Sequence, residues 1–230
     1  MGLFKPAWMK DNEEAAIRAI QKEKNANKLH VAKSVAPSFR VRAIAFEKLG
    51  NPRGAKYEIA LHSPDEAECL AALDEVDWNG WDQTLVEIVI LSNKEAVAAK
   101  ALELIQDDAV LAGAFTRTTN EQLIMKMLDK IERDGALQRL CGQAELRALP
   151  APLRFEVGRR IEDCETCVSA LGDIFARDTN AALSTLATVD DEEFLKQVVR
   201  QWLETTPDPL GLFGRLWKKT IVSAQVAKDL

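Results

Sequence analysis

The chain has few of the residues that usually carry catalysis. Its 230 residues include 2 His and 4 Cys, and aromatic residues make up 6% of the total. Histidine-based acid–base chemistry is therefore an unattractive prediction, and so few aromatics are unfavourable for a β-sandwich or barrel. There is no GxSxG, HExxH or HxE motif and no glycine-rich phosphate loop. The sequence predicts a non-enzymatic protein without catalytic residues.

The cysteines do not form a recognisable metal motif. Cys164 and Cys167 form one Cys-x-x-Cys motif, CETC. A zinc site needs further ligands, and His30 and His62 lie far away in sequence. Buried, reduced thiols are the favoured interpretation, so we predict no metal and no cofactor.

Long apolar segments are also missing. No run approaches the 18 or more apolar residues of a membrane span, and the N-terminus lacks the basic-then-apolar pattern of a secretory signal. We expect a cytoplasmic protein that makes no contact with a membrane.

What the chain does have is a 14-residue pattern that returns five times. The five repeat windows, numbered 1 to 5, are APSFRVRAIAFEKL (36–49), SPDEAECLAALDEV (63–76), SNKEAVAAKALELI (92–105), TTNEQLIMKMLDKI (118–131) and ALPAPLRFEVGRRI (148–161). Their last residues are 27, 29, 26 and 30 residues apart. Such a period is typical of a stacked array in which no unit can bury its own apolar face alone.

Each window is predicted to be a helix. Apolar residues at window positions 8, 11 and 14 follow a three-residue step, and position 8 supplies Ala43, Leu70, Ala99 and Met125 as expected core residues. The first positions of the windows carry Ser, Thr, Asn, Asp or Pro, which favour the start of a helix. A shorter helix is expected before each of the first four windows, at 27–35, 54–62, 83–91 and 108–117. The sequence thus predicts an all-α fold made of antiparallel helix pairs.

This pattern resembles the HEAT-like repeat proteins, in the short form with repeats near thirty residues and in the related leucine-rich-repeat-variant arrays. Window 1, with its Arg-Val-Arg-x-x-Ala run, matches best, and the opening MGLFKPAWMKDNEEAAIRAI is similar to the start of a group of bacterial HEAT-like proteins. The resemblance implies one domain over 1–230, an α-solenoid of about six antiparallel helix pairs in a right-handed superhelix. Residues 1–11 would cap it, 12–190 would form the repeats, and 191–230 would add C-terminal helices and a cap.

Charge is distributed unevenly along the chain. Residues 1–56 hold 12 Lys or Arg against 5 Asp or Glu, whereas residues 57–110 hold 2 against 13. Window position 12 carries a carboxylate in the first four windows: Glu47, Asp74, Glu103 and Asp129. Equivalent positions of stacked repeats line up, so we expect an acidic ridge beside the groove in which such arrays bind partners. The alternative interpretation is an ordinary solvated helix face.

Two tryptophans in the loop DWNGWDQ form a second candidate site. Trp78 and Trp81 are predicted either to pack against the adjacent repeat or to contact a partner, and Asp82 is expected to cap the next helix. The segment GWDQTLVEI also resembles Trp-Asp segments of HEAT-like DNA glycosylases for alkylated bases. Leu85, however, occupies the place where that family has its acid.

The sequence therefore predicts a protein–protein interaction scaffold with an acidic groove. Its partner would be a basic protein, or the basic N-terminal repeat of a second copy of the chain. A pI near 5.2 argues against nucleic acid, since carboxylates repel phosphates. Two alternatives remain open, the HEAT-like DNA glycosylase and a repeat-type lyase or chaperone for a protein-bound chromophore.

Overall fold

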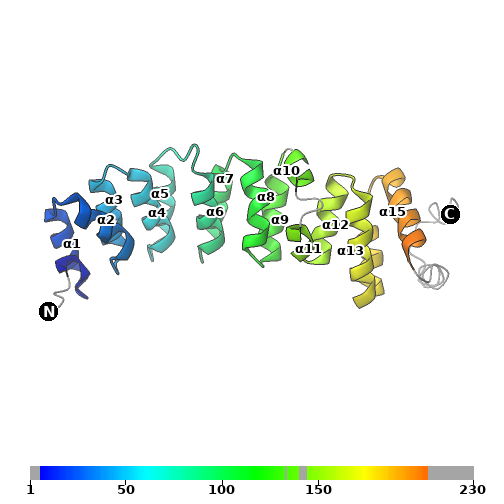
Figure 1. The fold of residues 1–230 in the computed structure, drawn as a ribbon, viewed down its shortest axis with the longest axis horizontal. Coiled ribbons are helices and arrows are strands. Elements are labelled where there is room, and N and C mark those ends of the chain that lie inside the picture. Colours follow the sequence, from blue (N-terminus) through cyan, green and yellow to red (C-terminus); the bar gives the residue numbers. More distant parts are fainter. Residues whose placement is uncertain (1–5, 133, 140–143, 207–230) are drawn as a thin grey trace. The chain divides into compact units, whose positions relative to one another are not determined.

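The computed structural model describes residues 6–132, 134–139 and 144–206. All regular elements in these residues are helices, and no strand occurs among them (Figure 1). The predicted all-α fold class is confirmed. Residues 207–230, which belong to the predicted C-terminal helices and cap, lie outside the described residues.

The chain divides into two compact units, Met1–Val110 and Leu111–Leu230, here called unit 1 and unit 2. One core cluster, which includes Trp8 and Ile20, lies in unit 1, and another, which includes Leu171 and Trp202, lies in unit 2. The single domain over 1–230 stays a prediction.

Unit 1 contains most of the regular helix pairs. Its elements are η1 (Ala7–Met9), α1 (Glu13–Lys22), α2 (Ala26–Val35), α3 (Phe39–Lys48), α4 (Pro52–His62), α5 (Glu66–Asp74), α6 (Asp82–Leu91) and α7 (Glu95–Leu104). The division between the units falls within α8 (Asp108–Ala114). Windows 1 to 3 thus contain α3, α5 and α7, as predicted. The helices that precede them are not shorter, since α4 has 11 residues and α5 has 9.

Unit 2 has longer helices and less regular connections. Its elements are η2 (Phe115–Arg117), α9 (Glu121–Lys130), α10 (Asp134–Gln138), α11 (Ala144–Ala148), α12 (Ala151–Arg160), α13 (Cys164–Arg177), α14 (Thr179–Leu186) and α15 (Glu192–Thr205). Windows 4 and 5 contain α9 and α12. The helix α13 packs against α12, α14 and α15, so it is the central helix of this unit.

Polar side chains start most of these helices by accepting a hydrogen bond from a first-turn backbone N–H. The capping residues are Asn12, Asn25, Ser38, Asn51, Asp65, Asn120, Asp163, Asp178 and Asp191. Two of the loops turn at a glycine in the left-handed region, Gly50 and Gly80, each with φ of 74°. The helix ends are therefore encoded locally, as the sequence predicts.

In unit 1, most helices that follow one another along the chain pack together (Figure 1). The pairs α2 with α3, α4 with α5, and α6 with α7 are in contact. Helices that lie two places apart along the chain are also in contact: α1 with α3, α4 with α6, and α5 with α7. This packing is compatible with a helical repeat, because each pair covers the apolar face of the next.

The face that each window helix buries differs from the prediction. Position 10 is buried in all five windows, in Ala45, Ala72, Ala101, Met127 and Val157. At position 8, however, Ala43 is buried, Leu70 and Met125 are only half-buried, and Ala99 is exposed. The prediction that Ala99 is a core residue is wrong. A three-residue step drifts around a helix with 3.6 residues per turn, so the true inward face lies nearer positions 7, 10, 11 and 14.

Trp8 covers the start of unit 1. It lies in η1, is 4% exposed and belongs to the same core cluster as Ala16 and Ile20 of α1. The N-terminal cap over residues 1–11 stays a prediction, with which the burial of Trp8 is compatible.

Candidate functional site

The position-12 carboxylates of unit 1 lie on the surface. Glu47 on α3, Asp74 on α5 and Glu103 on α7 are all exposed. Lys100 Nζ lies 2.9 Å from Asp74 Oδ1, and this hydrogen bond, with the charges of Asp74 and Glu103, raises the pKa of Lys100. A lysine therefore offsets part of the negative charge at two of these three positions.

Position 12 of unit 2 carries opposite charges in its two windows. Asp129 on α9 is exposed. Arg159 on α12 is half-buried, and its Nε donates to Glu156 Oε2 at 3.0 Å. Hydrogen bonding to Glu156 raises the pKa of Arg159, so this guanidinium is already engaged within its own helix.

The opposite charges of the two N-terminal segments pair with each other inside unit 1. Basic side chains of residues 1–56 contact acidic side chains of residues 57–110 in four ion pairs: Arg42 with Glu58 at 2.8 Å, Arg40 with Glu68 at 3.5 Å, Arg53 with Asp77 at 3.4 Å, and Lys56 with Glu75. Much of the uneven charge along the sequence is thus balanced between neighbouring helices, which leaves less of it for contact with a second copy.

The two loop tryptophans have different environments. Trp78 is 4% exposed and its Nε1 donates to Leu73 O at 2.8 Å. Trp78 therefore packs inside unit 1, and its indole is not accessible to a partner. Trp81 is half-buried, with the Arg53 guanidinium carbon 5.6 Å from its ring centroid. Trp81 is therefore the accessible tryptophan of this loop.

Asp82 does not cap α6, so that expectation is wrong. The N-cap residue is Trp81, which makes no side-chain cap. Asp82 Oδ1 instead accepts from Gln106 N at 2.6 Å and from Asp107 N at 3.3 Å. Its carboxylate ties the start of α6 to the segment between α7 and α8. Leu85, at the place of the glycosylase acid, is fully buried.

Three of the four cysteines lie within the described residues, and Cys141 lies outside them. Cys69 and Cys167 are buried and Cys164 is half-buried. Burial raises the pKa of Cys69 and Cys164, and raises the pKa of Cys167 to about 12. These thiols stay protonated at neutral pH and are poor nucleophiles. Within the described residues, no group of three or more His, Cys, Asp or Glu side chains is placed to hold a metal ion.

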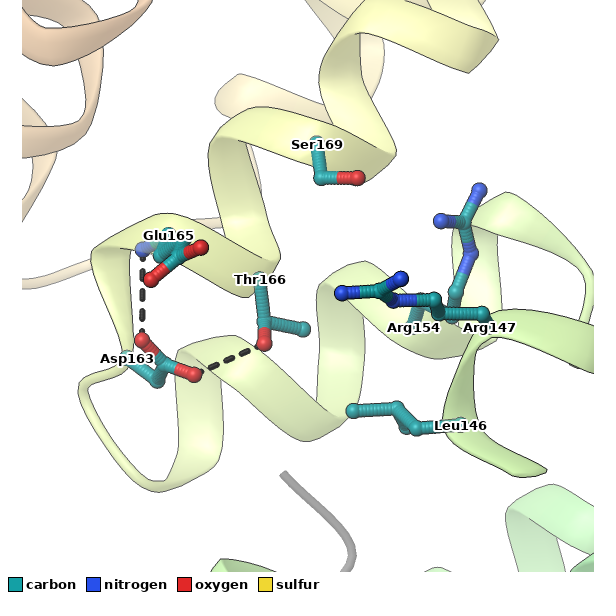
Figure 2. Close-up of a pocket in the computed structure, with 7 residues that line it drawn as sticks. All are labelled: Leu146, Arg147, Arg154, Asp163, Glu165, Thr166 and Ser169. Carbon is teal, nitrogen blue, oxygen red and sulfur yellow. Dashed lines mark hydrogen bonds between the residues drawn. The ribbon is translucent and has the colours of Figure 1, made fainter. Parts of the chain in front are cut away.

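A small cavity in unit 2 gathers charged and hydroxyl side chains. It has a volume of about 120 Å³ and is lined by Leu146, Arg147, Arg154, Asp163, Glu165, Thr166 and Ser169. Figure 2 shows the two arginines, from α11 and α12, opposite Thr166 and Ser169 of α13. Asp163 and Glu165 lie at the first turn of α13, on the other side of Thr166. The cavity therefore has a cationic side and an anionic side.

Arg154 is the unusual member of this cavity. It is 8% exposed, its terminal nitrogen pairs with Asp173 of α13, and its Nε is buried with no hydrogen-bond partner among the described residues. Leaving a buried charged donor unpaired is costly. The Nε of Arg154 is thus an unsatisfied buried donor that solvent does not reach.

This cavity was not predicted, although the sequence carries one indication of it. Arg154 occupies window position 7, where windows 2 to 4 have Cys69, Ala98 and Ile124. Position 7 lies on the inward side of these helices, so an arginine there needs a buried partner. The same signal identifies Arg42 in window 1.

No family model matches the chain, and neither a curated protein nor a solved structure is significantly similar to it. The described helices are compatible with a helical repeat, and the HEAT-like resemblance stays a prediction from the repeat windows. None of the helices in the described part of the chain is both long and apolar enough to cross a membrane.

Proposed function

We propose that the protein is a non-enzymatic scaffold that binds another protein, built as a HEAT-like α-solenoid of about six antiparallel helix pairs in a right-handed superhelix. The observation that supports this most is the packing in unit 1. There α4 packs on α6 and α5 packs on α7, in addition to the contacts within each pair. An array of this kind presents equivalent positions of successive helices in rows, and such rows are used as extended binding surfaces.

The acidic ridge is the proposed binding surface. Its members in unit 1 are Glu47, Asp74 and Glu103, which are exposed at the same window position. Position 10 is buried in each of these helices, so position 12 points away from the packed side. Asp129 of unit 2 is exposed at the same window position of its own helix, α9.

The preferred partner is a separate basic protein. Head-to-tail association of two copies would need free positive charge on residues 1–56, but Arg42 and Lys56 are already engaged with Glu58 and Glu75. A basic protein would supply its own cations and would be steered to the ridge at low salt.

The test compares three neutralised ridge residues with three neutralised residues elsewhere. Glu47→Gln, Asp74→Asn and Glu103→Gln together should abolish capture of basic partners at low salt, measured by pull-down with mass spectrometry and by cross-links that map to α3, α5 and α7. The control combines Glu14→Gln, Glu66→Gln and Glu204→Gln, which are also exposed and change the net charge equally. If both triple variants capture the same proteins as the wild type, the ridge is only a solvated face.

The two alternative functions have no specific support. A glycosylase would need a carboxylate free to act in a groove, whereas Asp82 is bound to two backbone N–H groups and Leu85 is buried. A chromophore lyase or chaperone remains a hypothesis whose partner subunit has not been identified.

A further inference from the structure

A second hollow of unit 2 is an apolar groove that opens on the surface. It has a volume of about 350 Å³ and is lined by residues of α9 and α12 and of the segment from α14 to Thr188. Its apolar lining consists of Met125, Pro152, Leu153 and Phe155. Met125 is only half-buried and Pro152 is exposed, so apolar surface here is left in contact with water. Covering such surface is favourable.

The polar groups on the rim of this groove leave little for a small polar ligand. The hydroxyls of Thr185 and Thr188 each donate to a backbone carbonyl, at 2.9 and 2.7 Å. Glu156 accepts from Arg159 Nε at 3.0 Å. Glu121, exposed in the first turn of α9, is the other carboxylate on the rim. The groove therefore favours an apolar group that carries a cation beside it.

The C-terminal sequence of the same chain has these properties. Residues 207–230 follow α15 and contain Phe213, Leu216 and Trp217. Their i, i+3 and i+4 spacing is that of the anchors by which an amphipathic segment lies in an apolar groove. Lys218 adjoins these anchors and supplies a cation.

The groove is also within reach of this segment. The helix α15 packs on α13, and α13 packs on both α12 and α14, which contribute residues to the groove. Residues 207–216 span up to about 35 Å when extended, whereas a compact unit of about 100 residues has a radius of gyration of about 13 Å. The segment is therefore long enough to cross unit 2.

We propose that the C-terminal segment 207–230 binds in this groove, with Phe213, Leu216 and Trp217 on its apolar lining and the basic side chains toward Glu121. This placement differs from a cap over the last helix, which would bring the same side chains to α15. The proposed site lies in unit 2 and does not depend on the acidic ridge.

The first experiment follows the NMR signals of isotope-labelled methionine methyl groups in the full chain. Of the 4 Met, Met125 lines the groove, and Met127, which is fully buried, is the internal control. An aromatic ring shifts the signal of a methyl group beside it, so Phe213→Leu or Trp217→Leu should move the Met125 signal and leave the Met127 signal in place. A Met125 signal that is unchanged in both variants would overturn the proposal.

The second experiment identifies the surface that the segment contacts. Phe213→p-benzoylphenylalanine in the full chain should cross-link under light to α9 or α12 of the same chain. Mass spectrometry of a mixture of isotope-labelled and unlabelled chains separates cross-links within a chain from cross-links between chains. Cross-links to α15 would instead support a terminal cap, and cross-links between chains would assign the groove to a second copy. Either result contradicts the proposal.

Matched substitutions then test the groove itself. Thr188→Lys places a charge on the rim and should lower the yield of this cross-link by about tenfold, because it repels the basic segment and obstructs its apolar side chains. Ser184→Lys is the control, since Ser184 is exposed on α14 but does not line the groove. Leu216→Asp should cause the same loss as Thr188→Lys without changing the circular dichroism spectrum. Equal yields in all three variants would show that the segment does not bind in the groove.

Discussion

Units 1 and 2 place an arginine at the same window position and use it differently. Arg42 of unit 1 donates to Glu58, a carboxylate whose side chain is 8% exposed, and to two backbone carbonyls. Arg154 of unit 2 is more deeply buried, yet its partner Asp173 is 58% exposed and its Nε is unpaired. A complete network fixes one packing arrangement, whereas an incomplete one leaves a buried donor unsatisfied. The regular unit thus holds a fully bonded arginine, and the irregular unit holds one that is only partly bonded.

The largest expected effect comes from placing a charge in either core. Leu73 of unit 1 is 1% exposed and Leu171 of unit 2 is fully buried, so Leu73→Asp and Leu171→Asp should each cost more than about 4 kcal/mol. The rate of backbone amide hydrogen exchange should then increase chiefly in the unit that carries the substitution. Leu91→Asp is the control, because Leu91 is 60% exposed. Equal exchange across both units in each variant would contradict two separate cores.

The second prediction tests the two arginines directly. Arg42→Met should destabilise the protein by about 3 kcal/mol, because it leaves the charge of buried Glu58 without its main partner. Arg154→Met should change the free energy of unfolding by less than about 1 kcal/mol, since Asp173 is solvated and the unpaired Nε disappears. Urea unfolding measures both. Equal losses would mean that Arg154 is as structural as Arg42, and Arg177→Met provides a surface reference.

The third prediction concerns helix contacts in the two units. A Cβ on Gly158 would lie 2.9 Å from Cys167 Sγ and 3.1 Å from Cys167 N, so Gly158→Ala must move the backbone of α13 and should cost about 1–3 kcal/mol. In unit 1, a Cβ on Gly54 would meet the Phe46 ring at 2.5 Å. That ring is half-buried and can tilt, so Gly54→Ala should cost less.

Gly172→Ala is the control for helix propensity. Nothing lies within 4 Å of a Cβ at Gly172, so this substitution should stabilise α13 by up to about 1 kcal/mol. Thermal unfolding of the three alanine variants should therefore rank Gly172→Ala above Gly54→Ala and Gly54→Ala above Gly158→Ala. A stabilising Gly158→Ala would show that α12 and α13 are not in close contact there.

The helices were predictable because their signals are local. Asn51, Asp65 and Asn120 cap helices within three residues of themselves, and each window keeps its helix through its own apolar spacing. The buried face was less predictable. Ala99 follows the same three-residue step as Leu102, yet only Leu102 is buried, because the neighbouring helix decides which part of a broad apolar stripe is covered.

The cavity could be predicted only in part. An arginine among inward positions indicates a buried partner, but Arg154 meets Asp173, which lies 19 residues away on another helix. Ser169 and Arg147 line the same space only because α12 packs on α13 and α11 supplies Arg147 to the cavity. Sequence spacing does not encode that geometry, whereas the exposure of Glu47, Asp74 and Glu103 follows from helix periodicity alone.

The smallest expected effect is a titration that reports on unit 1 alone. Tyr57 is the only tyrosine of the chain, and its hydroxyl donates to Glu87 Oε2 at 3.2 Å, from α4 to α6. Burial, followed by the charge of Glu87, raises the pKa of Tyr57 to about 12. The folded state therefore holds this proton more tightly than the unfolded state. The stability it contributes is complete below about pH 10 and is lost as the pH rises toward 12.

Glu87→Gln tests this contact between neighbouring helix pairs of unit 1. Removing the carboxylate charge should lower the pKa of Tyr57, measured by the ultraviolet absorbance of the phenolate, with little change in stability at neutral pH. Glu103→Gln, an exposed carboxylate of α7, should leave the titration unchanged. If Glu87→Gln titrates like the wild type, burial alone sets the pKa of Tyr57. The hydrogen bond from Tyr57 to Glu87 would then contribute little to the contact between α4 and α6.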